Sequence, residues 1–218
     1  MNEDIAIDSG CGTVSREIRR LDVDSPLGVV HLAGFAQKPD HRSVIFGILS
    51  DYWGAPVGAA DLCESPENSR PHFPELDFDV NWTHSGGYCV VAFGERGSLG
   101  RLRIGVDLER LSPRRLHLAD RFFSAEEAAC VKTLVESGKS GPAEREFFRL
   151  WCRKEAFYKC VGGDFFEGTL RRDMKKNPVR MEPAKKDGEP LTVHFVDLDG
   201  ATVGVPVPSA LCIAVSRF

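Results

Sequence analysis

The sequence predicts an α+β fold made of two duplicated halves, and two observations support this prediction. A segment with helical apolar periodicity, residues 41–53, precedes an apolar strand at residues 88–93. A second helical segment, residues 143–161, precedes another apolar strand at residues 211–215. This order of helix and strand, met twice, indicates a repeated unit with a cleft between its copies. We place an N-terminal half at 1–103 and a C-terminal half at 104–218, and expect ligands at their interface.

The composition is typical of a globular protein. The 218 residues carry a net charge of −4, with 42% hydrophobic and 28% charged residues. Because there is no basic excess, we expect no nucleic-acid binding. No signal-peptide pattern and no apolar run long enough for a membrane helix is present, so no membrane association is expected. The seven cysteines include no C-x-x-C pair, which predicts reduced thiols, a cytoplasmic protein and no zinc site.

The N-terminal half is expected to contain strands, one helix and a hairpin. Residues 28–35 predict a strand, and the helix over 41–53 should end at Gly54. The segment 63–79 is rich in proline and predicts loops. Residues 80–85 and 88–93, joined by two glycines, predict a hairpin. Thr83, His84 and Ser85 gather donors at its turn, which favours phosphate binding, although a lone histidine is more often structural.

Residues 103–110 alternate apolar and polar side chains, as a half-buried strand does. The alternation puts Asp107 and Glu109 on one face, where two neighbouring carboxylates repel unless a cation lies between them. Mg²⁺ prefers such oxygen ligands. The alternative is an exposed edge strand whose acidic side chains point into solvent.

The C-terminal half is expected to contain two helices and then strands. Ser124 and Glu127 fit a capping box, which is a sufficient explanation for Glu127. A central helix should begin near Ala143 and end at Gly162. Residues 170–218 predict strands, with turns at residues 187–188 and 199–200 and a last strand at 211–215.

The central helix carries Glu155 and Lys159 one turn apart on one face. The simplest interpretation is a pair that stabilises the helix by a few tenths of a kcal/mol. The other is a metal-binding carboxylate beside a phosphate-binding ammonium group. The stretch alone favours the first interpretation.

Four motifs, in order along the chain, carry a resemblance to a known family. They are His41-Arg42-Ser43, Asn81-Trp82-Thr83-His84-Ser85, Ile104-Gly105-Val106-Asp107-Leu108-Glu109, and Phe123-Ser124 with Trp151-Cys152-Arg153-Lys154-Glu155-Ala156-Phe157. Together they resemble the 4′-phosphopantetheinyl transferases of the surfactin-synthetase-activator type, a pseudo-dimeric single-chain class. The resemblance covers residues 38–218, and its G-[IV]-D-x-E and W-x-x-K-E-[AS] patterns are the most specific part.

The resemblance implies an enzyme that transfers the 4′-phosphopantetheine arm of coenzyme A to a serine of an apo acyl or peptidyl carrier protein. It implies Mg²⁺ held by Asp107, Glu109 and Glu155 at the pyrophosphate of coenzyme A. Glu155 would be the general base, and Lys159 and His84 would contact the phosphates. The residues implied at the adenine and 3′-phosphate end are Arg42, Ser43, Arg70, Pro71 and Thr83. A single metal site would explain both the acidic pair Asp107 and Glu109 on the strand and Glu155 on the helix. The resemblance therefore favours the metal interpretation.

The segment 111–123 is the expected contact with the carrier protein. It places four apolar side chains among arginines, and carrier domains present an acidic helix around their serine. These apolar residues are Leu116, Leu118, Phe122 and Phe123. The alternative is that they belong to the core and the arginines are solvated.

Two other functions compete with the transferase. One is a Mg²⁺-dependent phosphohydrolase or nuclease with the same acidic trio, and the other is a non-catalytic module that binds coenzyme A. The duplication within one chain predicts a monomer.

Overall fold

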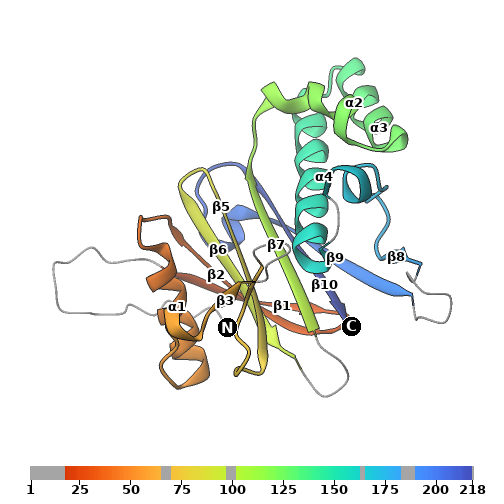
Figure 1. Ribbon diagram of the computed structural model, residues 1–218. Coiled ribbons are helices and arrows are strands. Elements are labelled where there is room, and N and C mark those ends of the chain that lie inside the picture. The colour runs from red at the N-terminus through yellow and green to blue at the C-terminus, as the bar shows by residue number, and fades with distance from the viewer. Residues whose placement is uncertain (1–17, 65–69, 97–101, 163–164, 183–189, 218) are drawn as a thin grey trace.

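The computed structural model describes residues 18–64, 70–96, 102–162, 165–182 and 190–217 (Figure 1). Its N-terminal elements are β1 (Arg19–Ser25), β2 (Gly28–Ala36), α1 (His41–Trp53), η1 (Ala59–Asp61), β3 (Cys63–Glu64), β4 (Pro71–His72), β5 (Phe78–Ser85) and β6 (Tyr88–Glu95). Its C-terminal elements are β7 (Leu102–Arg110), η2 (Pro113–Leu118), α2 (Ala119–Phe122), α3 (Ala125–Glu136), α4 (Ser140–Val161), η3 (Phe165–Thr169), β8 (Val179–Met181), β9 (Leu191–Asp199), η4 (Gly200–Val203) and β10 (Ser209–Arg217).

Two four-stranded antiparallel sheets form the centre of the molecule. Their strand orders are β1-β2-β6-β5 and β7-β10-β9-β8. The two sheets share one connectivity. In the first sheet, β2 precedes α1 in the chain and pairs with β6, which also pairs with β5. In the second sheet, β7 precedes α4 and pairs with β10, which also pairs with β9. The α+β class predicted from the sequence is therefore confirmed.

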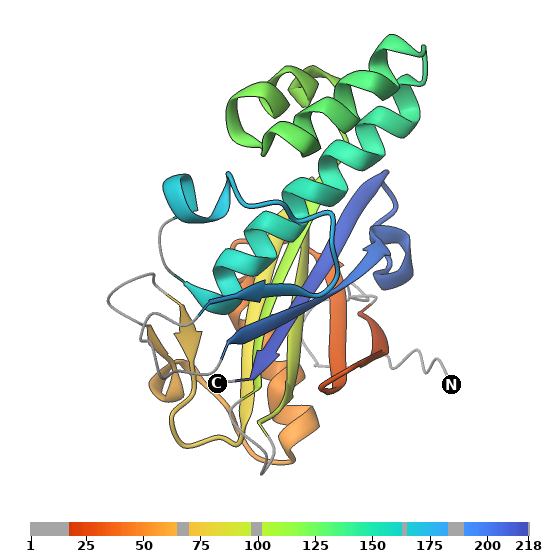
Figure 2. The ribbon, with the colours of Figure 1, turned by 90° about the vertical axis from the view of Figure 1, so that its right-hand side faces the viewer.

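The helices cover the outer faces of the two sheets. In Figure 1, α1 lies at the left and α4 at the right, with the sheets between them. One apolar cluster joins α1 to the first sheet and a second joins α4 to the second sheet. A third cluster lies between the sheets and includes Leu32 and Ala92 from the first with Val106 and Ile213 from the second. Figure 2 shows α4 running across the second sheet, with α2 and α3 beyond the ends of its strands.

Gly105 sets how closely α4 approaches β7. A Cβ atom at this position would lie 1.9 Å from the carbonyl oxygen of Ala156 and 2.6 Å from the amide nitrogen of Cys160. Only glycine allows the backbones of the strand and the helix to come this close. Asp107 and Glu109 follow on the same face of β7, so this contact brings them to the helix that carries Glu155 and Lys159.

Most predicted elements are present. The helix over 41–53 and the hairpin are confirmed, while β10 is longer than expected and the loop-rich segment 63–79 contains the two short strands β3 and β4. The central helix begins at Ser140, so its predicted start near Ala143 was wrong. Pro142 lies in the first turn of the helix, where backbone N–H groups have no partner within the helix, so a proline is tolerated there. The predicted turn at residues 187–188 lies outside the described residues, and residues 199–200 lead into η4.

The alternative for residues 103–110 is right about the edge position but wrong about exposure. β7 is at the edge of its sheet, yet Asp107 is only 5% exposed because α4 covers this face. None of the described helices is both long and apolar enough to cross a membrane.

Candidate active site

Asp107 and Lys159 form an ion pair where β7 meets the last turn of α4. Lys159 Nζ donates to Asp107 Oδ1 at 2.7 Å and to the carbonyl oxygen of Val106 at 3.1 Å. The other carboxylate oxygen of Asp107 is buried and accepts no hydrogen bond from the described residues. A buried, unpaired carboxylate oxygen is costly, so its presence indicates a place for a further cationic or donor group.

Glu109 lies two residues further along the same face of β7. Its Oε2 atom accepts a hydrogen bond from Ser85 Oγ at 3.3 Å and is 3.2 Å from Arg115 Nη1. Burial and the charge of Asp107 raise the pKa of Glu109, against the opposing effect of Arg115. Asp107 and Glu109 are therefore close enough to disfavour ionisation of both carboxyl groups together.

Glu155 faces the same region from α4. Burial and the charge of Asp107 together raise the pKa of Glu155 to about 7, against the opposing effect of Lys159. Burial alone lowers the pKa of Lys159, but the charges of Asp107 and Glu155 outweigh it and the net shift is upward. Two cations, Lys159 and Arg115, thus lie beside three carboxyl groups, which leaves an excess of negative charge when all three are ionised.

These carboxyl groups fit a hard divalent cation in donor chemistry. In the parts of the chain that the structure describes, no three His, Cys, Asp or Glu side chains are already gathered closely enough to hold an ion. The lysine ammonium group occupies one oxygen of Asp107 instead. A bound cation would give the remaining oxygen of Asp107 a partner and would lower the raised pKa values of Glu109 and Glu155. Oxygen donors of this kind suit Mg²⁺.

A cavity of about 330 Å³ opens beside Glu155 and Lys159. Its lining residues are Arg42, Glu64, Arg70, Pro71, Asn81, Trp82, Glu155, Tyr158 and Lys159. Five of them were predicted from the sequence: Arg42, Arg70, Pro71, Glu155 and Lys159. The fold therefore brings together, in one cavity, residues that are more than one hundred positions apart in the chain.

The two arginines of this cavity differ in their surroundings. Arg42 is exposed and pairs with Glu64 at 2.9 Å. Arg70 is buried, pairs with Asp79 and donates to the carbonyl oxygens of Ile104 and Lys159. Arg70 therefore joins β5, β7 and α4, and Arg42 is the more accessible of the two to a ligand.

Ser43, Thr83 and His84 do not line this cavity. Ser43 is exposed in the first turn of α1. Thr83 is buried and its hydroxyl group bonds to Asp107, while His84 is exposed, with its ring centroid 6.3 Å from that of His41. Because side chains alternate along a strand, Thr83 and His84 point to opposite faces of β5.

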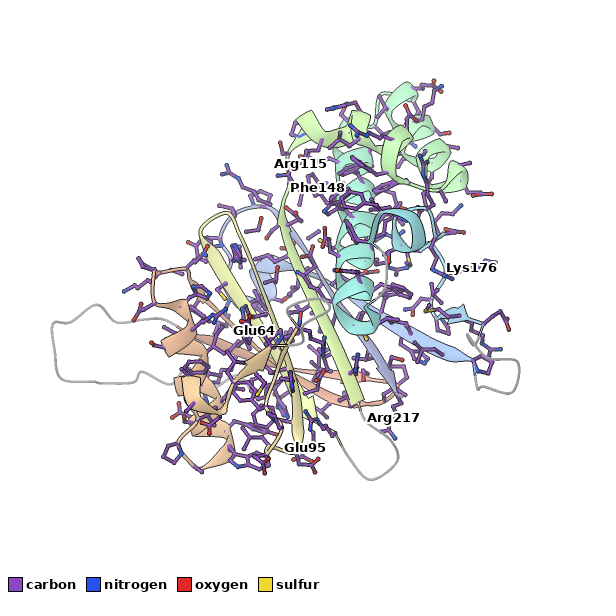
Figure 3. All side chains as sticks on the ribbon, in the orientation of Figure 1. Glu64, Glu95, Arg115, Phe148, Lys176 and Arg217 are labelled. Atoms are coloured by element: carbon purple, nitrogen blue, oxygen red, sulfur yellow. The ribbon has the colours of Figure 1, made fainter. Side chains whose placement is uncertain are left out.

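A second cavity, of about 430 Å³, lies at the Glu109 end of β7. Its lining residues are Ser85, Gly86, Glu109, Arg110, Leu111, Ser112, Pro113 and Arg115. Figure 3 labels Arg115 at this end of β7, and Glu64, which lines the first cavity, well below it. The acidic residues of β7 and α4 thus have one cavity on each side.

The predicted carrier contact is only partly accessible. Leu116, Leu118 and Phe122 are partly buried against the core around α4. Phe123 is 1% exposed, and its ring stacks on Phe147 with 4.9 Å between centroids. The prediction that Phe123 contacts a partner was therefore wrong, because the packing of α3 against α4 buries it.

The capping box at Ser124 and Glu127 is confirmed, but it is an incomplete explanation for Glu127. Glu127 Oε2 also lies 2.7 Å from Lys154 Nζ, and both side chains are fully buried. This pair could not be predicted from the sequence, because the two residues belong to different helices and neither spacing nor periodicity relates them.

Other residues of the two cavities were also missed. Glu64 and Tyr158 carried no clear signal, and Asn81 and Trp82 stand in one of the four motifs but were given no role. Ser85 belongs to the group of donors at the hairpin turn, which could have marked it. Arg110 and Arg115 were expected only as part of a basic surface.

Comparison with known proteins gives the class of this site. A family model described as the 4′-phosphopantetheinyl transferase superfamily matches residues 103–200, which include β7 and α4. The chain is 36% identical over 105 residues to 4′-phosphopantetheinyl transferase psf-1 of Bacillus pumilus, which is 46% of this chain and 40% of that protein. It is 34% identical over 97 residues to 4′-phosphopantetheinyl transferase Sfp of Bacillus subtilis, which is 44% of this chain and 39% of that protein.

A further relative, 4′-phosphopantetheinyl transferase ffp of Bacillus subtilis, is 34% identical over 136 residues, or 59% of this chain and 55% of that protein. The chain thus spans about half, or somewhat less, of the length of these relatives. The matches confirm, for this part of the chain, the resemblance to 4′-phosphopantetheinyl transferases of the Sfp type.

Proposed function

We propose that this protein transfers 4′-phosphopantetheine from coenzyme A to a serine of an apo acyl or peptidyl carrier protein, and releases adenosine 3′,5′-bisphosphate. One observation carries the proposal most strongly. The acidic pair Asp107 and Glu109 faces Glu155 and Lys159 beside a cavity, and Asp107 keeps a buried oxygen without a partner. With a divalent cation held by these carboxylates, the site would bind a phosphate group through charge neutralisation.

The active site lies between two halves, residues 1–103 and 104–218, in this proposal. Two findings support the division. The strand order around α1 matches that around α4, and the first cavity is lined by residues of both halves. A pseudo-two-fold relation between the halves accounts for both findings.

Coenzyme A occupies the first cavity in this proposal. Inside the cavity, Lys159 contacts its phosphates and Arg42 its adenine and 3′-phosphate end. His84 and Ser43 lie outside the cavity lining, and they would contact the parts of the phosphates and of the adenine end that extend beyond it. Arg42 is exposed at the cavity and held only by a surface pair with Glu64, so a phosphate can replace that partner at small cost. Arg70, Pro71 and Thr83 complete this end mainly by fixing the walls, since Arg70 and Thr83 already bond to protein groups.

Asp107, Glu109 and Glu155 are the residues that would hold Mg²⁺. When bound, the ion neutralises negative charge on the pyrophosphate. The raised pKa values of Glu109 and Glu155 support this role, because a cation favours the ionised carboxylates that burial disfavours.

Glu155 accepts the proton of the attacking serine in this proposal. The serine oxygen forms a new P–O bond to the phosphorus that carries the pantetheine arm. The P–O bond to the bridging pyrophosphate oxygen breaks, and its electron pair leaves with adenosine 3′,5′-bisphosphate, whose charge Lys159 stabilises. An unassisted serine is a poor nucleophile, and a carboxylate positioned beside it can take its proton.

The carrier protein approaches from the Glu109 end of β7. The second cavity is lined there by Arg110 and Arg115, and the partly exposed side chains of Leu116, Leu118 and Phe122 follow it in the chain. A basic and apolar surface of this kind complements an acidic helix around the carrier serine. Phe123 supports this surface from the core.

We further propose that the chain acts as a monomer in the cytoplasm. The thiols of Cys89, Cys152, Cys160 and Cys212 are free and buried, and so pack as small apolar groups in a manner suited to a reducing compartment.

The intact mass of an apo carrier protein, after incubation with this protein, coenzyme A and Mg²⁺, tests the function. We expect a gain equal to one phosphopantetheine group on the carrier, lost when the carrier serine is replaced by alanine. No gain with fatty-acid, polyketide and peptide carriers, together with hydrolysis of a phosphodiester, would instead support the phosphohydrolase. Binding of coenzyme A without either reaction would support a non-catalytic module.

A further inference from the structure

The two sheets meet along a ladder of side-chain to backbone hydrogen bonds between β5 and β7. The amide N–H groups of four alternate residues of β7 point at β5. They donate to polar side chains of β5 in four bonds: Ile104 N to Asp79 Oδ2 at 2.7 Å, Val106 N to Asn81 Oδ1 at 3.1 Å, Leu108 N to Thr83 Oγ1 at 3.3 Å and Arg110 N to Ser85 Oγ at 3.0 Å. Each bond joins residues 25 positions apart, so the ladder keeps one register throughout.

The last two bonds of this ladder carry a second contact. Thr83 Oγ1 lies 3.2 Å from Asp107 Oδ1, and Ser85 Oγ lies 3.3 Å from Glu109 Oε2. Asp107 directly precedes Leu108, whose N–H donates to Thr83. Glu109 directly precedes Arg110, whose N–H donates to Ser85. The same arrangement therefore occurs twice, once for each acidic residue of β7.

The direction of these bonds follows from the groups that make them. A backbone N–H can only donate, and an ionised carboxylate can only accept. The hydroxyl oxygen of Thr83 thus accepts a hydrogen bond from the N–H of Leu108, and the hydroxyl hydrogen is available to donate to Asp107. The same reasoning directs the hydroxyl hydrogen of Ser85 at Glu109.

The residue types along β5 change where the acidic residues begin. Asp79 and Asn81 accept from the N–H groups of Ile104 and Val106. The residues of β7 just before these two are Arg103 and Gly105, which carry no carboxylate. A carboxylate at position 83 or 85 would repel Asp107 or Glu109. A hydroxyl is the small group that both accepts the N–H and donates to the carboxylate.

We propose that Thr83 and Ser85 are positioning residues that fix the side chains of Asp107 and Glu109 for a divalent cation. This inference rests on the metal site of the proposed function and deepens it. Thr83 and Ser85 act from the other half of the molecule, so the alignment of the two sheets sets the orientation of the carboxylates. Partners that orient metal-binding groups typically change metal affinity by about 10- to 100-fold when removed.

Binding of Mn²⁺, followed by electron paramagnetic resonance of the free ion with and without coenzyme A, tests this inference without an activity assay. Thr83→Val and Ser85→Ala should each weaken Mn²⁺ binding by about 10-fold or more. Thr83→Ser and Ser85→Thr keep the hydroxyl and should stay within about threefold of the wild type. Ser85 is only partly buried, so its variants remain informative if Thr83→Val does not fold.

Asn81→Leu is the matched control, and it is compared with Thr83→Val in the absence of coenzyme A because Asn81 lines the first cavity. It removes the acceptor of Val106 N from the same ladder but takes no partner from a carboxylate. If it weakens Mn²⁺ binding as much as Thr83→Val, the hydroxyls act only through sheet alignment and the inference is overturned. Unchanged affinity in both Thr83→Val and Ser85→Ala, or no Mn²⁺ binding by the wild type under either condition, would also overturn it, whether or not the carrier protein is modified.

Discussion

Two lysines of α4, Lys154 and Lys159, each place Nζ 2.7 Å from a carboxylate oxygen, but the two pairs differ in burial and in how many hydrogen bonds the carboxylate accepts. Lys154 and Glu127 are fully buried, and both oxygens of Glu127 accept further bonds, from the amides of Ser124 and Met174. Lys154 also donates to the carbonyl oxygen of Arg172 at 2.6 Å. This pair is complete within the protein.

The pair of Lys159 and Asp107 is incomplete. The lysine side chain is 25% exposed at a cavity, one oxygen of Asp107 has no partner among the described residues, and Glu155 and Glu109 add negative charge nearby. Saturation of hydrogen bonds thus distinguishes an ion pair that holds helices together from one arranged for a ligand. The spacing of the residues in the sequence does not distinguish them.

Lys154→Met should have the largest effect on stability. It leaves the carboxylate of Glu127 buried without its cation, which costs about 3–5 kcal/mol of the free energy of unfolding. Urea denaturation at neutral pH measures this loss. The double variant Glu127→Gln with Lys154→Met removes the uncompensated charge and should recover at least half of the loss. Equal stability of the single and double variants would show that the charge of Glu127 is not the cause.

Glu155→Gln should change how stability depends on pH in the absence of metal. The folded-state pKa of Glu155, about 7, is raised above its ordinary value of 4.5. Its contribution to stability is therefore fully present below pH 4.5 and is lost as pH rises through about 7. Since the side chain is partly exposed, we expect the variant to gain about 1 kcal/mol relative to the wild type between pH 5 and pH 8.

Urea denaturation of both proteins across this pH range, in the presence of a chelator, gives the comparison. Parallel curves for the wild type and Glu155→Gln would contradict the raised pKa. Whatever its stability, the variant should retain the fold and lose carrier modification, because it can neither accept the proton nor bind the cation as a carboxylate does.

Arg42→Ala should have the smallest effect on stability. Its pair with Glu64 is exposed, so the free energy of unfolding should change by less than about 0.5 kcal/mol. If Arg42 meets a phosphate of coenzyme A, the KM for coenzyme A should rise by about 10-fold with little change in kcat. Arg20→Ala is a matched control, because Arg20 forms a similar exposed pair with Asp51 away from the cavity. An equal rise in KM for both variants would exclude a specific role for Arg42.

Periodicity and turn residues were sufficient for much of the fold. They located α1, the hairpin of β5 and β6, and β7, because each element carries its own apolar pattern. The acidic residues and Lys159 were found because strand alternation and helix spacing place them on defined faces. The burial of Phe123, the structural bonds of Arg70 and the pair of Glu127 with Lys154 were not found, since each depends on packing between elements that are distant in the chain.

The ladder between β5 and β7 shows the same limit. Thr83, His84 and Ser85 were recognised as a group of donors, and phosphate was the ligand suggested by their chemistry. Two of these donors face β7 instead, at a register that only the docking of the two sheets determines.

The rate of carrier modification per folded molecule, measured by intact mass at a temperature where each variant is folded, tests the contrast between the two lysines most directly. The double variant Glu127→Gln with Lys154→Met should modify the carrier at close to the wild-type rate. Lys159→Met should be slower by about 100-fold or more, because it loses the cation that stabilises the leaving phosphate. A folded Lys159→Met variant with the wild-type rate would contradict the account.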